Sequence, residues 1–207
     1  MMADPASTYS ASDVLIEATS RRLWNEDESE LRILDICKET NLSTSVIYGH
    51  FGSRQGLINA SLLHIFALVT DEIIANLDTS ASHTRSTGSF VNALVSLLAN
   101  ADYQEDLNRQ RQMFFRVSAT ALSRPSIRPG FLELYGRYLE RSDVIYQDLL
   151  DGGHLSRELS ARQWALFFEG QMLSRAFHHL SPNWYNQDDW LRSAHDMLSA
   201  AKPGIIS

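Results

Sequence analysis

One stretch of this chain, residues 32–51 (RILDICKETNLSTSVIYGHF), constrains the fold more than any other. Its apolar residues recur at helical spacing and predict two short helices joined by a tight turn. With Ile47 on the buried face of the second helix, Phe51 falls beside it, because successive helical residues are about 100° apart. Ser43 stands at the N-cap position, where its hydroxyl can accept a first-turn amide. A short helix pair with a small, polar and aromatic outer face is typical of a helix-turn-helix.

Residues 36–57 read I-C-x-x-T-N-L-S-x-x-x-I-Y-x-H-F-x-S-R-x-x-L. This pattern resembles the signature of the TetR-type bacterial transcriptional regulators, whose usual form is I-A-x-x-A-G-V-S-x-x-x-L-Y-x-H-F-x-S-K-x-x-L. The preceding residues fit in register, with Leu15 to Ala18 and Leu23 at the family's apolar positions. The resemblance implies an all-α fold of about nine helices: a three-helix DNA-binding domain followed by a larger helical ligand-binding and dimerisation domain. We expect a tail at 1–10, the helix-turn-helix domain at 11–56 and the larger domain at 57–203.

The second helix of the motif offers several groups that suit double-stranded DNA. Hydroxyls in its first turn can hydrogen-bond phosphates or base edges, and Val46 can contact a thymine methyl. Gly49 lowers helix stability by roughly 1 kcal/mol relative to Ala, and close approach to the groove would offset this. Arg54, in the first turn of the next helix, opposes the helix dipole, which favours a phosphate partner over a stabilising role. The predicted DNA-binding residues are Arg32, Thr44, Ser45, Val46, Tyr48, Gly49, His50 and Arg54.

The charge balance is unusual for a DNA-binding protein. The net charge is −7, and residues 1–60 hold five Lys and Arg against nine Asp and Glu. Phosphate attraction supplies most non-specific affinity, so such a domain should bind non-specific DNA weakly. The acidic run at 26–30 (EDESE) is either a solvated turn, with Asp27 capping the next helix and Glu30 closing a capping box, or a loop that weakens DNA docking. Asn41 replaces the family's turn glycine and tolerates positive φ.

The rest of the chain has the pattern of an all-α protein, without the alternation of a half-buried strand. We expect a loop at 80–88 and breaks at Pro125 and Pro129. Gly152 and Gly153 read as a helix end, because no strand precedes them as a phosphate loop would require. Residues 160–163 form a capping box. The predicted helices span about 53–77, 90–99, 105–122, 131–150, 160–180 and 186–201.

The predicted helix at 160–180 is apolar on two sides. One stripe holds Trp164, Phe168 and Met172, and both stripes must be covered. A second subunit is the simplest cover for the other stripe, as in TetR-like proteins, whose last two long helices pair in a four-helix bundle; burial inside a monomer is the alternative. The predicted dimer-interface residues are Leu166, Gly170, Leu173, Phe177, Leu180, Trp190, Ala194 and Met197. A two-fold dimer would read a near-palindrome with half-sites about 34 Å apart.

The larger domain is rich in aromatic residues, which either pack a plain core or line an effector pocket. The family resemblance implies a small-molecule effector, and the lining favours a mainly apolar one of unknown identity. The predicted pocket residues are Phe66, Phe90, Phe114, Phe115, Tyr135, Trp164, Phe167 and Phe168. Candidate polar anchors are Arg109, Arg111, Arg116, Glu169, Gln171 and His178. A ligand that prefers the DNA-incompetent arrangement would release DNA by population shift.

Other classes of protein find little support in the sequence. It has no G-x-S-x-G, H-E-x-x-H, P-loop or nucleotide fingerprint, so we expect no enzyme, no metal and no cofactor. The single cysteine, Cys37, suits a reducing cytoplasm and fits a small core position better than a redox role. No signal peptide precedes the motif, and no apolar run approaches the roughly 18 residues of a membrane span, so we expect no membrane partner. The rival to a homodimeric, ligand-responsive repressor is a helical interaction module that has lost operator binding.

Overall fold

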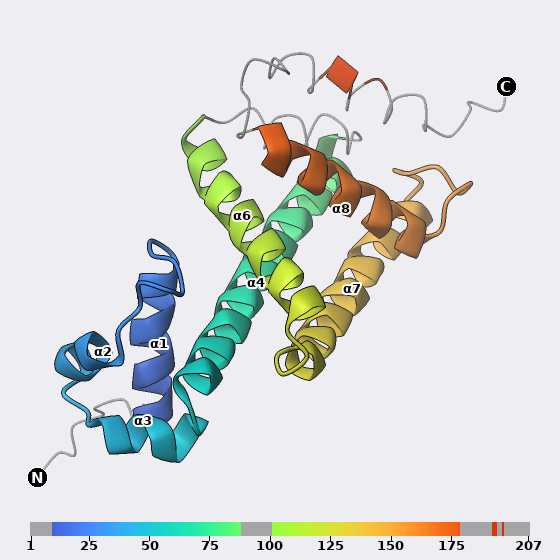
Figure 1. The fold of residues 1–207 in the computed structure, drawn as a ribbon. Helices are drawn as coiled ribbons and strands as arrows, with labels where there is room; N and C mark the ends of the chain where they lie inside the picture. The colour runs from blue at the N-terminus through green and yellow to red at the C-terminus, as the bar shows by residue number, and fades with distance from the viewer. Residues whose placement is uncertain (1–9, 88–100, 179–191, 194–195, 197–207) are drawn as a thin grey trace, which may run out of the picture. The chain divides into compact units, whose positions relative to one another are not determined.

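A computed structural model describes residues 10–87, 101–178, 192–193 and 196 of the chain (Figure 1). Within these residues every regular element is a helix, in agreement with the predicted all-α class. The predicted helix at 90–99 and most of the one at 186–201 lie outside the described residues, so the expected total of about nine helices stays a prediction. The helices are α1 (Ala11–Leu23), α2 (Ile33–Thr40), α3 (Thr44–Phe51), α4 (Arg54–Thr87), α6 (Ala101–Ser123), α7 (Arg128–Asp151) and α8 (Ala161–His178).

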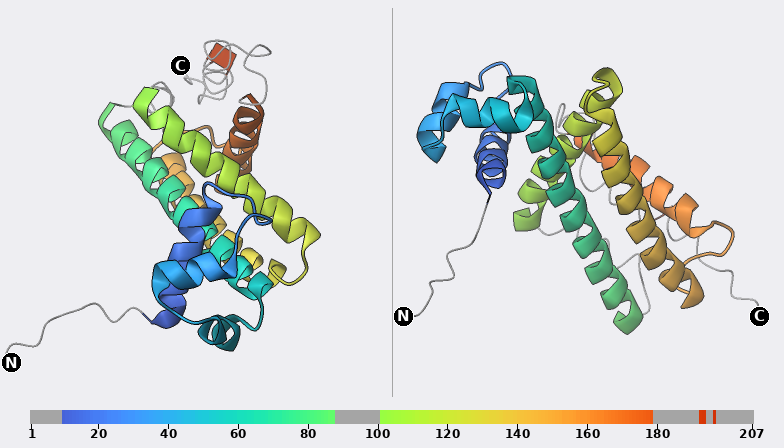
Figure 2. Two further views of the ribbon diagram at one scale, coloured as in Figure 1. Left: turned by 60° about the vertical axis from the view of Figure 1, so that its left-hand side comes forward. Right: turned by 90° about the horizontal axis from the view of Figure 1, so that it is seen from below.

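The first three helices pack against one another as a small cluster, visible in both views of Figure 2. A capping box starts α1: the Ser10 hydroxyl accepts from the Asp13 amide, and the Asp13 carboxylate accepts from the Ser10 amide. The turn between α2 and α3 begins at Asn41, whose φ of 56° confirms the predicted left-handed residue. The core between the helices is apolar, and its fully buried side chains include Leu15, Ile36 and Ile47.

Two predicted caps in this region are wrong in detail. Ser43 occupies the N-cap position of α3, but its hydroxyl makes no cap bond and lies 2.7 Å from the Ser45 hydroxyl instead. Asp27 does not cap α2, which has Arg32 as its N-cap residue. The Glu30 side chain does reach back to the Asp27 amide at 3.4 Å, so the acidic run forms a separate turn before the helix. The predicted contact between Glu30 and Asp27 therefore forms, but it stabilises a turn before α2 and not the first turn of α2.

Helix α4 is longer than predicted, because the expected loop at 80–88 is helical to Thr87. The loop was predicted from the Ser and Thr residues of this stretch. In the structure their hydroxyls donate to backbone carbonyls one turn earlier: Ser80 to the Asn76 carbonyl at 3.0 Å, and Thr84 to the Ser80 carbonyl at 2.7 Å. Ala81 and Thr84 are fully buried. Hydroxyls satisfied inside the helix leave no reason for a break. The predicted start is confirmed, since the Ser53 hydroxyl accepts from the Gly56 amide at 2.9 Å.

One of the two prolines acts differently from the prediction. Pro125 lies in the turn between α6 and α7, as predicted, but Pro129 lies in the first turn of α7, which begins at Arg128, three residues before the predicted start at 131. A proline is tolerated there because first-turn amides have no partner within the helix. Helix α8 opens with the predicted capping box, in which Ser160 and Gln163 exchange bonds of 2.8 and 3.3 Å. Gly153, with φ of 72°, ends α7 as predicted.

The chain divides into two compact units, each built from more than one segment. The first unit comprises residues 1–68 and 117–131, and the second comprises 69–116 and 132–207. The predicted boundary at residue 56 therefore falls inside the first unit, since the start of α4 and the connection from α6 to α7 belong with the helix-turn-helix. In the second unit a buried cluster gathers residues of α4, α7 and α8, with Trp164 and Leu149 among its members.

Helix α4 also corrects the prediction that no apolar segment has the length of a membrane span. By length and composition alone, the stretch Arg54–Thr84 could cross a membrane, with a mean hydropathy of 1.6 over its most apolar 18-residue window. Half of that window is buried inside the protein, as in the core helix of a globular chain. The small polar residues Ser61 and Thr70 interrupt the run in the sequence, but both are buried in the fold.

Candidate functional site

Helix α3 presents the outward face that the sequence predicts. Ile47 is fully buried, while Ser45, Gly49 and His50 are exposed and Tyr48 is 49% exposed. Gly49 has nothing within 4 Å of a built Cβ atom, so no contact inside the protein explains this glycine. The helix ends at Gly52, whose φ is 70° and whose amide bonds the Tyr48 carbonyl at 2.9 Å. Thr44 and Val46 are half-buried at the edge of this face.

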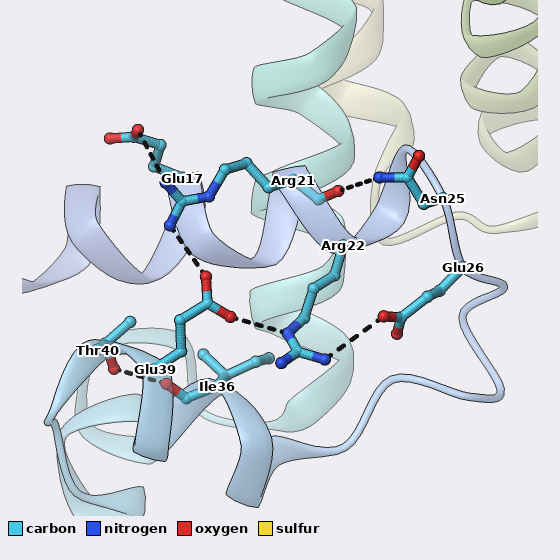
Figure 3. Close-up of polar contacts among 8 residues, drawn as sticks. All are labelled: Glu17, Arg21, Arg22, Asn25, Glu26, Ile36, Glu39 and Thr40. Atoms are coloured by element: carbon cyan, nitrogen blue, oxygen red, sulfur yellow. Dashed lines mark hydrogen bonds and ion pairs between the residues drawn. The ribbon is translucent and has the colours of Figure 1, made fainter.

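A cluster of charges fixes α2 against α1 (Figure 3). Glu39 of α2 accepts from two arginines of α1 at once: Arg21 Nη2 and Arg22 Nε each donate to one of its carboxylate oxygens at 3.0 Å. Arg22 also lies 3.4 Å from the Glu26 carboxylate, at the start of the acidic turn. Two cations of the helix-turn-helix unit are thereby engaged by carboxylates. Their contribution to stability is modest individually, since partly exposed pairs contribute about 0–1 kcal/mol.

Arg54 has a structural role that its sequence position did not reveal. Its Nη2 donates to the Leu31 carbonyl at 2.8 Å and to the Glu28 carbonyl, and its Nε donates to Leu31 at 3.2 Å. The guanidinium therefore joins the start of α4 to the turn before α2. The argument that a cation here serves no purpose in stability is wrong, because these bonds offset an unfavourable dipole contribution of about 0.3–1 kcal/mol. Contact with a phosphate stays a prediction for this residue.

A second arginine reaches the same turn from a distant part of the sequence. Arg124, which follows α6, donates to the Glu28 carboxylate at 2.8 Å and to the Asn59 side chain of α4 at 2.9 Å. Both partners lie in the first unit with it. Glu28 is thus held through its carbonyl by Arg54 and through its carboxylate by Arg124. The acidic turn is a fixed part of the unit, and sequence reasoning missed Arg124 because its partner is 96 residues away.

The cations that remain available near the motif are few. Within the described part of residues 1–60, Arg32 and Lys38 are exposed and make no ion pair or hydrogen bond with another side chain. Arg32 was predicted to bind DNA, whereas Lys38 was not selected. Both stand on α2 or at its N-cap. They supply the positive charge that this surface can offer to a phosphate backbone.

Gly56 holds the angle between α3 and α4 and was also missed by the sequence reasoning. A Cβ atom built on Gly56 would lie 2.0 Å from the Phe51 carbonyl oxygen. Backbone cannot yield as a flexible side chain can, so any other residue would force α3 and α4 apart. The signal was present in the sequence, because a glycine inside an amphipathic helix lowers stability unless something requires it.

The structure separates the predicted effector-pocket residues into two groups. Phe66 is fully buried in the first unit, where its ring centroid lies 4.8 Å from that of Phe131. The other described candidates lie in the second unit, and Phe90 lies outside the described residues. Rings of α8 pack on each other and on α7, with Phe168 stacked on Tyr146 at 5.4 Å. The second-unit candidates are Phe114, Phe115, Tyr135, Trp164, Phe167 and Phe168.

A partly buried carboxylate lies among the aromatic residues of the second unit. The Tyr135 hydroxyl of α7 lies 2.9 Å from each carboxylate oxygen of Glu169 of α8. Burial raises the pKa of Glu169, and the Tyr135 hydrogen bond opposes this only in part. Burial and the negative charge of Glu169 together raise the pKa values of Tyr135 and Tyr138, so both phenols are neutral at physiological pH. Glu169, one of the predicted polar anchors, thus lies against a tyrosine of α7.

One face of α8 is apolar and uncovered. Leu166 is 52% exposed and Leu173 is 40% exposed, while Trp164 on the opposite face is 2% exposed. Between the two leucines, Gly170 has nothing within 4 Å of a built Cβ atom. Helix α8 is therefore apolar on two sides, as predicted, and its own unit covers one of them. The side chain of Phe177 and residues Leu180, Trp190, Ala194 and Met197 lie outside the described part.

The arrangement of α1 to α3 defines a helix-turn-helix unit, joined to a helical unit with an aromatic core. No family model matches the chain. Over 71 residues the chain is 30% identical to the HTH-type transcriptional regulator AlkX of Mycobacterium tuberculosis, a match that spans 34% of each protein. Among residues that the structure describes, no group of three or more His, Cys, Asp or Glu could hold a metal ion.

Solved structures resemble the chain over nearly its whole length. A TetR-family regulator from Cytophaga hutchinsonii is 15% identical with a TM-score of 0.65, and the match covers 95% of this chain and 98% of that one. A candidate transcriptional regulator from Saccharomonospora viridis, in complex with choline, is 17% identical with a TM-score of 0.62 over 91% and 95%. Escherichia coli NemR in its reduced form is 13% identical with a TM-score of 0.62 over 95% and 100%. The resemblance seen in the sequence is confirmed: this chain has the fold of the TetR-family transcriptional regulators.

Proposed function

We propose that this protein is a ligand-responsive transcriptional regulator that binds a near-palindromic DNA operator as a homodimer. The observation that carries the proposal is the outward face of α3, with Tyr48, Gly49 and His50 exposed on a helix-turn-helix whose core is closed behind it. Exposed polar and aromatic groups on a short helix suit the major groove. Structures with the same fold are regulators, which favours this reading over an unrelated helical module.

Each predicted contact has a distinct role in the proposal. Tyr48, Arg32 and Arg54 position the protein on phosphates, while Ser45 and Val46 meet base edges. Thr44, Gly49 and His50 complete the surface. Since phosphate contacts carry no sequence information, losing them should weaken binding to all DNA alike, whereas a change at Val46 should alter which bases are preferred.

The proposed dimer forms through the uncovered face of α8. An apolar helix face with two leucines more than a third exposed is costly in water, and a second copy of the same helix would bury it. Gly170 lies at the centre of that face, where the absence of a side chain permits close approach of two helices. Such a dimer is two-fold symmetric, so the operator should be a near-palindrome with half-sites about one helical turn apart.

An effector binding in the second unit would release the DNA, and repression is the sign of regulation that the family resemblance favours. Buried polar atoms without a partner support a ligand site in this unit: Asn76 Nδ2 and Gln110 Oε1 make no hydrogen bond. Orphaned buried groups are expensive unless a water or a ligand satisfies them. The apparent operator affinity would fall by the ratio of the ligand's affinities for the two arrangements.

Selection of bound duplexes from a random DNA pool at low salt tests the proposal. Recovery of a palindrome with half-sites about one helical turn apart is the expected result. Recovery of no sequence, from protein shown to be folded and dimeric, would reject the regulator and favour a helical interaction module that lacks operator binding. The excess of Asp and Glu over Lys and Arg in residues 1–60 is the observation that keeps this second candidate in view.

A further inference from the structure

The carboxylate of Glu169 has no counter-ion among the residues that the structure describes. It is partly buried on α8, and within the described residues its polar partner is one neutral group, the Tyr135 hydroxyl. A carboxylate offers about four lone-pair positions, and a single hydroxyl proton can serve one oxygen at a time. Burying a charge without pairing it is costly, and that cost is tolerated where function requires it.

The nearby cation does not satisfy Glu169. Arg162 lies close enough to Tyr135 to act on that phenol electrostatically, but its guanidinium donates twice to the Asp143 carboxylate, with the Nε contact at 2.9 Å. Of the cations in the described part of the chain, none shifts the pKa of Glu169, which responds to burial and to the Tyr135 hydrogen bond. The charged and titratable groups that the described contacts place at this cluster include Glu169, Arg162 with Asp143, Tyr135 and Tyr138. Among the described residues, none supplies a counter-charge to Glu169.

Two tyrosines of α7 lie close to this charge, since Tyr135 bonds it and the charge raises the pKa of Tyr138. Tyr135 and Tyr138 lie one turn apart on α7 with ring centroids 6.1 Å apart, and Phe114 of α6 meets Tyr138 edge to face at 5.9 Å. Ring faces attract cations within about 6 Å of their centroids, and weakly hydrated organic cations lose little solvation on entering such a setting. A carboxylate among tyrosine and phenylalanine rings is complementary to an alkylammonium group, which has positive charge but few or no N–H donors.

We propose that the effector of this protein is an organic cation of the quaternary or bulky ammonium class, held by the Glu169 carboxylate and the rings of Tyr135 and Tyr138. This inference rests on the proposed function, in which the second unit binds an effector. It replaces the mainly apolar effector expected from the sequence with an apolar body that carries a positive charge. The Tyr135 hydroxyl holds the carboxylate in place, and the bound cation supplies the missing counter-charge.

Matched pairs of probes isolate the charge. Choline and 3,3-dimethylbutan-1-ol differ in one atom, a quaternary nitrogen against a quaternary carbon, and benzyltrimethylammonium with neopentylbenzene provides a larger pair. Calorimetric titration of the full-length protein should show roughly tenfold or greater preference for the cation in at least one pair. Glu169→Gln should abolish the preference, whereas Glu140→Gln, the same change at an exposed position on α7, should keep it.

Stability without ligand provides a second readout. Glu169→Gln keeps the shape and can still bond Tyr135, so removal of an uncompensated charge should leave the thermal midpoint unchanged or raise it. A variant that loses stability would mean that Glu169 is structural. Absence of a cation preference in both pairs, or its persistence in Glu169→Gln, would also overturn the inference.

The two proposals fail separately. Protein that selects a palindromic operator but does not discriminate the probes is a regulator of some other effector class, and the inference alone falls. If the protein prefers cations through Glu169 but selects no DNA sequence, the inferred ligand site stands and the proposed regulatory function is rejected. Release of a selected operator by the preferred cation would join them.

Discussion

Arg54 provides the sharpest test of how the helix-turn-helix unit is built. In the structure its guanidinium donates to the carbonyls of Leu31 and Glu28, with contacts to Leu31 at 2.8 and 3.2 Å. Arg54→Ala removes these bonds and frees the turn before α2. Net contributions of charged hydrogen bonds are about 1.5–3 kcal/mol each, but the carbonyls can rehydrate and the dipole conflict is relieved. The free energy of unfolding should therefore fall by about 2 kcal/mol, which lowers Tm by roughly 4–8 °C.

The assay is thermal and urea unfolding of the DNA-free protein, with hydrogen exchange of the α2 amides to locate the change. Arg54→Lys should also lose most of this stability, because an ammonium lacks the planar fork that spans two carbonyls. Arg32→Ala is the matched control: Arg32 is exposed and without a side-chain partner, so stability should be unchanged while DNA affinity falls. If Arg54→Ala unfolds like the wild type and only loses DNA affinity, the clamp is refuted and the phosphate contact predicted from the sequence is favoured.

Three further results are expected. In urea unfolding, Gly56→Ala should lower the free energy of unfolding by about 1–3 kcal/mol or more, because its Cβ atom would lie 2.0 Å from the Phe51 carbonyl oxygen. Gly49→Ala is the matched control: the space around Gly49 is open, so this variant should be as stable as the wild type or more stable, and it should reduce DNA binding alone. Leu166→Glu should shift the protein from dimer to monomer in analytical ultracentrifugation, and a dimer of unchanged affinity would exclude this face. Cation affinity should fall as the pH is lowered through the raised pKa of Glu169, because binding needs the carboxylate; a flat calorimetric profile would contradict that dependence.

The helix-turn-helix could be predicted from the sequence because its signals are local. The buried position of Ile47, the left-handed Asn41 and the Ser53 cap each depend on residues within a few positions of each other. The extension of α4 could not be predicted in the same way. Ser80 and Thr84 favour loops when exposed, and only burial in the second unit makes bonding to their own helix the better choice.

The roles of the arginines were hidden because their partners are distant in the sequence. Arg54 bonds residues 23 and 26 positions earlier, and Arg124 reaches Glu28 across 96 positions. Similarly, the aromatic residues of the larger domain were predicted as one set, yet Phe66 belongs to the first unit. Composition identifies which side chains will be buried, but only the path of the chain decides which of them meet.

The acidic composition of residues 1–60 is less of an obstacle to DNA binding than its count suggests. Glu39 and Glu26 are paired with arginines of α1, and Glu28 is paired with Arg124, a cation that lies outside the counted segment. A carboxylate paired at 2.8–3.4 Å presents a dipole rather than a full charge to a phosphate more than a Debye length away, about 8 Å at physiological salt. Among the described residues up to 60, Arg32 and Lys38 are cations outside any ion pair, but Asp27, Glu30 and Asp35 are carboxylates outside any ion pair as well. Pairing therefore removes only part of the excess negative charge. If the protein binds an operator as proposed, so few cations would leave most of the affinity to base contacts and to the two sites of the proposed dimer.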